Sequence, residues 1–319
     1  MRTDTVIGLL LAVFLVAGCG QRKTESFEAL SFPDVTVPSM MESAQQRADY
    51  LAEHFWDRLT DPERVYPSDS SLVSGVLKED VEQKFANWVS VLDMTDLKVS
   101  EKAVSRLFRR ISECEKKDSS SNVFETITAL SEKYLYDPNS PLRNEEYYLH
   151  FARHMASYGG NPQEIRDKYA YHARVCALNR LGTKAADFRF ADRHGRMHTL
   201  HGIEAPLTLL FFSNPGCDAC MNIIEMLKGE PAVSRMISEG VLAVVNIYID
   251  EDIAAWRDYM PVYPDNWYNG FDPDLVIRTD NLYNVRAIPS LYLLDKEKGV
   301  ILKDAPESKV MSYLTGIRF

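Results

Sequence analysis

The sequence has few cysteines, no surplus of positive charge and only one long hydrophobic run. Its 319 residues include five cysteines, too few for a scaffold built on disulfide bonds. The 36 lysines and arginines face 46 aspartates and glutamates, which gives a formal charge of -10. Nucleic acid is therefore not expected as a partner, because a phosphate-binding surface requires excess basic side chains.

The overall composition is typical of a globular protein. Hydrophobic residues make up 45% of the chain and charged residues 26%, values that fit neither a disordered chain nor a protein with several membrane spans. The length allows about two domains of ordinary size, each able to bury its own core.

The first segment, "MRTDTVIGLLLAVFLVAGCG", has the features of an export signal. Its apolar run from Val6 to Val16 is too short to span a bilayer comfortably. The ending "LVAGC" resembles a bacterial lipobox, which implies a signal peptide over 1–18 and an acylated Cys19. The alternative is an ordinary signal peptide in which the cysteine has no role. Polar residues 19–42 are then expected to form a lipid-anchored tether.

Residues 43–182 are predicted to form an all-α helical domain. Apolar residues recur there at helical spacing, and we expect them to form core stripes. They include Val81, Phe85, Trp88, Val89 and Leu92, and then Val104, Leu107, Phe108 and Ile111. For the last helix, Asn161 is the expected cap, Pro162 the first helical residue and Gly182 the C-terminal stop.

Residues 183–319 are predicted to form an α/β domain. "ADFRF" and "RMHTL" flank a turn and indicate a hairpin, while "LTLLFF" and "VLAVVNIYI" are typical of buried strands. A helix is expected from Cys217 to about Lys228, and a strand "SLYLLD" follows Pro289. A turn at Gly299 leads to a strand "VILK", and a closing helix is expected over 306–316.

Cys217 and Cys220 stand where a strand is predicted to end and a helix to begin. A cysteine in the first helical turn meets free backbone N–H groups and the positive end of the helix dipole, which favour the thiolate. One turn later Cys220 is close enough to form a disulfide. The alternatives are a zinc site with two of three upstream histidines, a peroxide-reducing thiol, or inert packing. The histidines are His194, His198 and His201.

The region from about 185 to 319 resembles the thioredoxin-fold domain of TlpA/ResA-type thiol-disulfide oxidoreductases. The residues that carry the resemblance are "ADFRFADRHGRMHTL", the "CDAC" motif, "YNVRAIPSLYLLD" with Pro289, and Gly299. The resemblance implies that Cys217 is the nucleophile and Cys220 the resolving thiol. It also implies a cis Pro289 beside the disulfide and a backbone at Ile288 that pairs with an extended substrate.

The same resemblance implies protein disulfides as substrates, a membrane dithiol protein as electron donor and no bound cofactor. The acyl chains on Cys19 are expected to anchor the protein in the lipid bilayer, which places it in the cell envelope. The expected site is the periplasm-facing side of the outer membrane of a Gram-negative bacterium. The helical region, with "YLAEHFWD" and "YDPNSPLRNEEYYLHFARHM", resembles an uncharacterised domain that precedes thioredoxin modules in bacterial lipoproteins.

Several positions depart from the family pattern. Gly216 and Ala219 replace the Trp and Pro often found there, and Phe211 cannot supply the buried acid of several members. Asp218 places a negative charge beside Cys217, which favours a reductase or isomerase over a strong oxidant. The competing hypothesis is a lipoprotein binding module that uses the fold without redox turnover.

Two further features stand outside the motif. Cys114 and Cys176 lie on predicted apolar helix faces and are expected to be buried free thiols rather than a bridge. Residues 256–271, "WRDYMPVYPDNWYNGF", form an aromatic insertion. We expect it to pack against the sheet, and a substrate-docking lip is the alternative.

Overall fold

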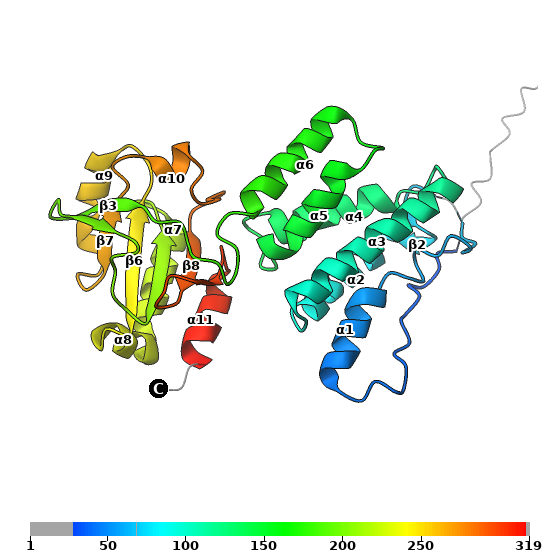
Figure 1. Cartoon of the computed structure of the whole chain (residues 1–319), viewed down its shortest axis with the longest axis horizontal. Coiled ribbons are helices and arrows are strands. Elements are labelled where there is room, and N and C mark those ends of the chain that lie inside the picture. The colour runs from blue at the N-terminus through cyan, green and yellow to red at the C-terminus, as the bar shows by residue number, and fades with distance from the viewer. Residues whose placement is uncertain (1–27, 68, 317–319) are drawn as a thin grey trace, which may run out of the picture.

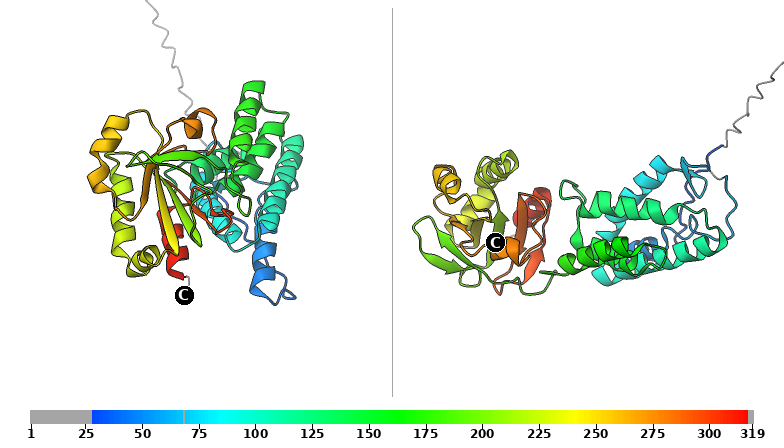
Figure 2. Two further views of the ribbon diagram at one scale, coloured as in Figure 1. Left: turned by 60° about the vertical axis from the view of Figure 1, so that its left-hand side comes forward. Right: turned by 90° about the horizontal axis from the view of Figure 1, so that it is seen from above.

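The structure, a computed structural model, describes residues 28–67 and 69–316. The predicted signal peptide over 1–18 and the predicted lipidation site Cys19 lie outside these residues. Figure 1 shows two halves side by side, a helical half and a half built on a sheet, and the other two views in Figure 2 keep them adjacent.

The helical half is formed by six α-helices among the described residues, together with two short elements that the sequence did not indicate. The α-helices are α1 (Ala44–His54), α2 (Lys78–Leu92), α3 (Leu97–Lys117), α4 (Val123–Ser131), α5 (Glu145–Ser157) and α6 (Gln163–Cys176). The additional elements are the hairpin β1 (Leu72–Val73) and β2 (Val76–Leu77) and the π-helix η1 (Glu132–Tyr136). The predicted stripes on α2 and α3 are buried in one hydrophobic core, so the helical periodicity identified the core correctly.

Helix α6 differs from its predicted boundaries. Pro162 precedes the first helical residue, Gln163, and no side chain caps this end. Asn161 instead donates from its side chain to the carbonyl of Met155 at 3.0 Å. The helix ends at Cys176, and Gly182 belongs to the connection that follows it.

Part of the predicted tether packs on the helical half. Phe32 is 8% exposed and its ring lies 5.7 Å from those of Phe55 and Trp56. Leu30 forms an isolated bridge with Val76 of β2. Residues 30–32 are therefore held against the domain by a backbone bridge at Leu30 and by aromatic contacts at Phe32.

The second half contains a mixed sheet with strand order β4-β3-β7-β6-β5-β8-β9. Its strands are β3 (Arg189–Asp192), β4 (Met197–Thr199), β5 (Leu207–Phe212), β6 (Leu242–Tyr248), β7 (Tyr268–Phe271), β8 (Ser290–Leu294) and β9 (Val300–Leu302). Strands β5, β6 and β7 are parallel to one another, while β8 runs antiparallel to β5. All but β7 were predicted; β7 lies in the aromatic insertion, where the sequence has no alternating pattern.

Helices cover both faces of this sheet. They are α7 (Asp218–Gly229), α8 (Pro231–Ser238), α9 (Ile253–Asp258), the 3-10 helix η2 (Met260–Val262), α10 (Val276–Thr279) and α11 (Glu307–Gly316). Buried side chains of α7, α8, α9 and α11 share a core with Leu209 and Phe211 of β5. On the other face, Leu210 and Phe212 pack in a core with Ile277 of α10. The alternation along β5 thus places one central strand between two apolar layers.

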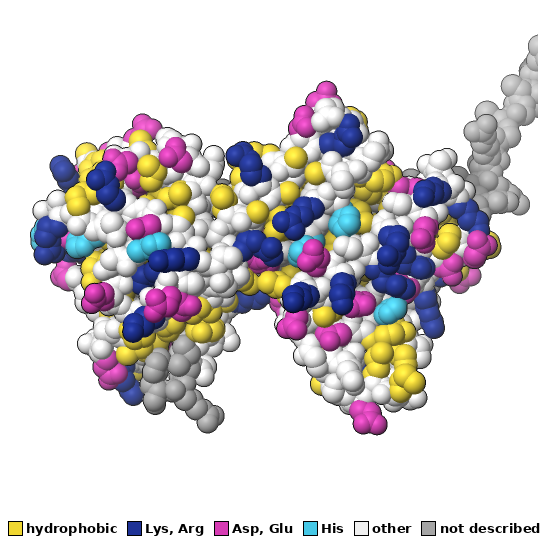
Figure 3. Space-filling model, in the orientation of Figure 1, with side chains coloured by type: hydrophobic (Ala, Val, Ile, Leu, Met, Phe, Trp, Pro, Cys, Tyr) yellow, Lys and Arg dark blue, Asp and Glu magenta, His cyan; other side chains and the backbone are white. Residues whose placement is uncertain are grey.

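The face of the molecule seen in Figure 3 is mixed in charge. Figure 3 shows acidic and basic side chains interspersed over the visible face of both halves. None of the helices in the described part of the chain has the length and apolar character needed to cross a lipid bilayer.

Candidate active site

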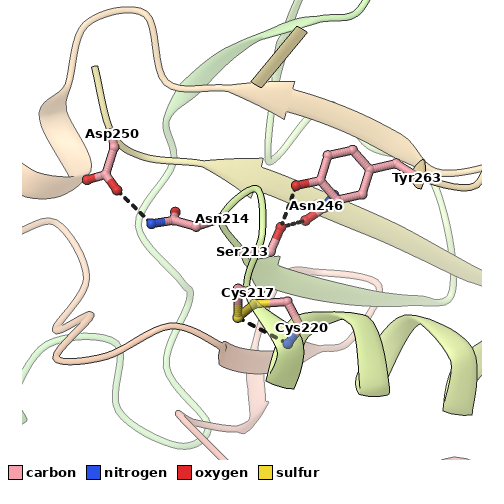
Figure 4. The surroundings of a disulfide bond; sticks show 7 residues. All are labelled: Ser213, Asn214, Cys217, Cys220, Asn246, Asp250 and Tyr263. Carbon is pink, nitrogen blue, oxygen red and sulfur yellow. Dashed lines mark hydrogen bonds between the residues drawn. A yellow bond between two sulfur atoms is a disulfide. The ribbon is translucent and has the colours of Figure 1, made fainter. Parts of the chain in front are cut away.

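Cys217 and Cys220 form a disulfide at the start of α7 (Figure 4). Their Cα atoms lie 5.2 Å apart, one helical turn from each other. Cys217 is the N-cap residue of the helix, and its Sγ accepts a hydrogen bond from the backbone N–H of Cys220 at 3.1 Å. When the pair is reduced, this N–H and the helix dipole favour a negative charge on the sulfur of Cys217.

The two cysteines differ in their access to solvent. Cys217 is partly exposed, whereas Cys220 is only 2% exposed and belongs to the core beneath the helix. Another molecule would therefore meet Cys217 before Cys220. The roles of nucleophile and resolving thiol stay predictions.

Gly216 explains one departure from the family pattern. Its φ angle is +70°, in the left-handed region, and a Cβ atom there would meet nothing within 4 Å. The conformation rather than lack of space therefore favours glycine. A tryptophan at this position would be strained by its own backbone.

A buried, uncharged cluster lies beside the segment that leads to Cys217, and we call it the neutral cluster. It consists of Ser213, Asn246, Tyr263 and Asn269, each at most 3% exposed. Ser213 Oγ donates to Asn246 Oδ1 at 2.5 Å and lies 3.5 Å from the hydroxyl of Tyr263. Asn246 Nδ2 donates to Asn269 Oδ1 at 3.0 Å. Figure 4 shows Ser213, Asn246 and Tyr263 grouped on one side of the disulfide.

The neutral cluster lies next to Phe211, the position at which several family members have a buried acid. Phe211 pairs with Asn246 across β5 and β6, so the polar group is on the neighbouring strand. Burial raises the pKa of Tyr263, which keeps its phenol protonated at neutral pH. Sequence reasoning missed these residues, although an asparagine within the apolar run "VLAVVNIYI" was a signal for them.

A second contact holds the same segment from the solvent side. Asn214 Nδ2 donates to Asp250 Oδ2 at 2.7 Å, and the other oxygen of Asp250 is paired with Arg278 at 2.7 Å. Figure 4 shows this contact on the side of the disulfide away from Tyr263. The residues just before Cys217 are therefore held at two consecutive positions, 213 and 214.

Sheet register brings Pro289 to the same end of the sheet. Ser290 of β8 lies opposite Phe212 of β5, so Pro289 lies beside the residue that follows β5. The Ile288–Pro289 peptide bond is cis, as the family resemblance implied. Ile288 and Cys217 are both partly buried against one hydrophobic core. The substrate-guiding role of Ile288 and Pro289 stays a prediction.

Two of the three histidines considered as zinc ligands have other side-chain partners. His198 Nε2 lies 3.0 Å from Asp192 Oδ2, and His201 Nε2 lies 2.8 Å from the carbonyl oxygen of Ala185. Over residues 28–67 and 69–316, no group of three or more histidines, cysteines, aspartates or glutamates has an arrangement that could hold a metal ion.

The remaining cysteines are both free and buried, as expected. Burial raises the pKa of both Cys114 and Cys176, so neither thiol is activated. The aromatic insertion packs largely as expected: Trp256, Tyr263 and Trp267 are at most 6% exposed. Asn269 fastens its loop by donating to the carbonyl of Pro264 at 2.7 Å.

Comparison with known proteins agrees with this architecture. Residues 18–173 match a family described as "Domain of unknown function (DUF5106)". A thioredoxin-like protein from Bacteroides caccae is 34% identical over 91% of this chain and 100% of its own, with a TM-score of 0.77. The C-terminal domain of an uncharacterized protein from Bacteroides fragilis is 47% identical over 43% of this chain and 98% of its own, with a TM-score of 0.42. No protein of curated description matches the chain.

The strand order, the position of the cysteine pair and the Pro289 loop define a thioredoxin-like fold preceded by helices, which confirms the predicted fold class. Given the similarity along nearly its whole length to the Bacteroides caccae protein, the chain belongs to the thioredoxin-like proteins. The narrower TlpA/ResA resemblance and the lipoprotein features stay predictions.

Proposed function

We propose that this protein is an extracytoplasmic thiol-disulfide oxidoreductase that acts on disulfide-bonded proteins. The observation that carries the proposal is the cysteine pair itself. The sulfur of Cys217 is partly exposed at a helix N-terminus, and the buried Cys220 stands one turn behind it. An accessible thiolate with a resolving partner is what disulfide exchange requires.

The exchange proceeds in two displacements. The Cys217 thiolate attacks one sulfur of a substrate disulfide, so a mixed disulfide forms and one substrate thiolate leaves. The Cys220 thiolate then attacks the Cys217 sulfur, which closes the internal disulfide and releases the second substrate thiolate. The substrate gains two electrons and this protein loses two. A membrane dithiol protein restores the reduced pair, and no bound cofactor takes part.

Asp218, the first residue of α7, sets the direction of transfer in this proposal. Its carboxylate disfavours a thiolate at Cys217, and a less stable thiolate makes the pair a weaker oxidant. We expect a reduction potential nearer the thioredoxin value of about -270 mV than the value of about -120 mV found in strong oxidants. A potential near the second value would contradict the reductase or isomerase assignment.

The location in the cell envelope is part of the same proposal. The "LVAGC" ending supports acylation of Cys19 and attachment to the bilayer facing the periplasm. Mass spectrometry of the mature protein is expected to show an N-terminal Cys19 that carries acyl chains. A mature N-terminus with an unmodified Cys19 would contradict the lipid anchor.

Trapping of mixed disulfides tests the activity. A Cys220→Ala variant expressed in its host is expected to hold substrates covalently at Cys217, because the resolving attack is missing. The matched Cys217→Ala variant keeps, of the pair, only the buried Cys220 and is expected to trap no substrate. If the first variant traps nothing and the wild type does not reduce disulfide-bonded proteins, the binding-module hypothesis replaces this proposal.

A further inference from the structure

A buried ionic cluster joins the helical half to the loop that carries Pro289. Its four charged side chains are Glu145 on α5, Arg286 in the loop, and Lys303 and Asp304 after β9, and we call it the interface cluster. These side chains are between 1% and 10% exposed. Two acids face two bases, so the set balances in charge.

The contacts of Glu145 reach across the two halves. Its Oε1 accepts from Asn284 Nδ2 at 2.5 Å and lies 3.2 Å from Arg286 Nε. Its Oε2 lies 3.0 Å from Lys303 Nζ. The carboxylate of Glu145 therefore contacts two residues of the loop. Lys303, from the half built on the sheet, balances its negative charge.

Asp304 holds the other end of the same loop. Its Oδ2 is paired with Arg286 Nη2 at 2.7 Å, and its Oδ1 accepts from Ser290 Oγ at 2.8 Å. The Arg286 guanidinium also lies 4.3 Å from the ring centre of Tyr136, which comes from the helical half. Residues 284, 286 and 290 are thus fixed on both sides of Pro289.

We propose that the helical half is part of the exchange site, with Glu145 as the positioning residue that holds the 284–290 loop beside the cysteines. This inference rests on the proposed function, because the loop matters for exchange only if substrate binds along it. It assigns a role to a half that carries none of the reacting atoms. Buried charged contacts suit this role because their geometry is fixed by several partners at once.

Glu146 offers a matched control on the same helical turn. Its side chain is 2% exposed and binds Arg180 at 2.6 Å and 2.9 Å, and it also accepts from the N–H of Leu181 at 3.0 Å. These partners lie in the connection between the halves rather than in the loop. Glu146→Gln removes a buried, arginine-paired charge as Glu145→Gln does, but leaves the loop contacts in place.

Hydrogen exchange measured on the full chain tests the positioning without any activity. Glu145→Gln is expected to speed exchange of backbone amides in 284–291, and Glu146→Gln is expected to speed it only near 178–182. If Glu145→Gln is too unstable, Asn284→Ala removes one contact from the loop side and is expected to act in the same direction. Equal exchange of 284–291 in the two glutamine variants would overturn the proposal.

Kinetics then connect the positioning to exchange. For a disulfide-bonded peptide, Glu145→Gln is expected to lower kcat/KM roughly tenfold, mainly through KM. Hydroxyethyl disulfide needs no backbone pairing, so its rate is expected to stay unchanged. Equal losses on both disulfides would contradict a positioning role. A wild type that reacts with neither disulfide would refute the proposed function, while hydrogen exchange would still decide whether Glu145 holds the loop.

Discussion

The neutral cluster and the interface cluster hold the two segments that meet at the candidate active site, but they differ in charge. Within the neutral cluster, Ser213 belongs to the segment before the cysteines, and only amide and hydroxyl groups hold it there. The interface cluster binds the loop around Pro289 with two acids and two bases. Both are buried, so the difference lies in chemistry rather than in access to solvent.

This difference separates the two tasks of the site. A buried carboxylate close to a thiol raises the pKa of the thiol, whereas hydroxyl and amide groups position the backbone without adding a charge. Hydrogen bonds between charged groups are stronger than those between neutral groups when every charge has its partner. In this protein the buried charges lie where the helical half contacts the half built on the sheet. We infer that buried charge in this protein secures the loop, and that buried neutral groups support the segment before the cysteines. The charged Asp250 that also holds this segment lies on its solvent side.

Removing a charge from the interface cluster is expected to have the largest effect on stability. Glu145→Ala leaves Lys303 buried without an acidic partner and leaves Arg286 with Asp304 alone. The expected loss is about 3–5 kcal/mol in the free energy of unfolding. Urea unfolding of the full chain measures it. A loss no larger than that of an exposed carboxylate would show that the cluster contributes little.

Removing the centre of the neutral cluster is expected to cost less. Asn246→Ala leaves Asn269 Oδ1 without its donor and Ser213 Oγ with only the Tyr263 hydroxyl at 3.5 Å, at a cost of about 1–3 kcal/mol. Ser213→Ala in the same chain removes one of these stranded groups, so the double variant is expected to lose less than the sum of the single losses. Additive losses in urea unfolding would show that the two side chains do not act together.

Acid is expected to weaken the helical half with a smaller effect. Burial lowers the pKa of His172 from 6.5 to about 4. Its ring Nδ1 is hydrogen-bonded to the hydroxyl of Tyr148 at 2.8 Å. Between these pH values the unfolded chain binds a proton that the folded chain does not, so stability falls as the pH falls. After allowance for partial exposure, the expected loss is about 1–2 kcal/mol.

Unfolding measured between pH 7 and pH 4 tests this sign. His172→Gln keeps a side chain able to bond Tyr148 and is expected to flatten the pH dependence. Burial also lowers the pKa of His150 and His154, so part of the dependence is expected to remain. A His172→Gln variant with an unchanged slope would contradict the assignment.

The sequence predicted those parts of the molecule that depend on local patterns. The apolar stripes of α2 and α3, the strand β5 and the cysteine pair at the start of α7 follow from spacing alone. The interface cluster does not, because Glu145 and Asn284 are 139 residues apart and meet only when the two halves pack together. Strand β7 was missed for a similar reason, since it is defined by pairing with β3 and β6 rather than by its own residues.

The most direct test of the redox assignment is an electron balance on the intact protein. Reduced protein is mixed with a disulfide-bonded peptide, and free thiols on each partner are counted by alkylation and mass spectrometry. We expect a disulfide to form between Cys217 and Cys220, and the peptide to gain two thiols for each such disulfide. Cysteines that stay reduced beside an intact peptide disulfide would contradict it.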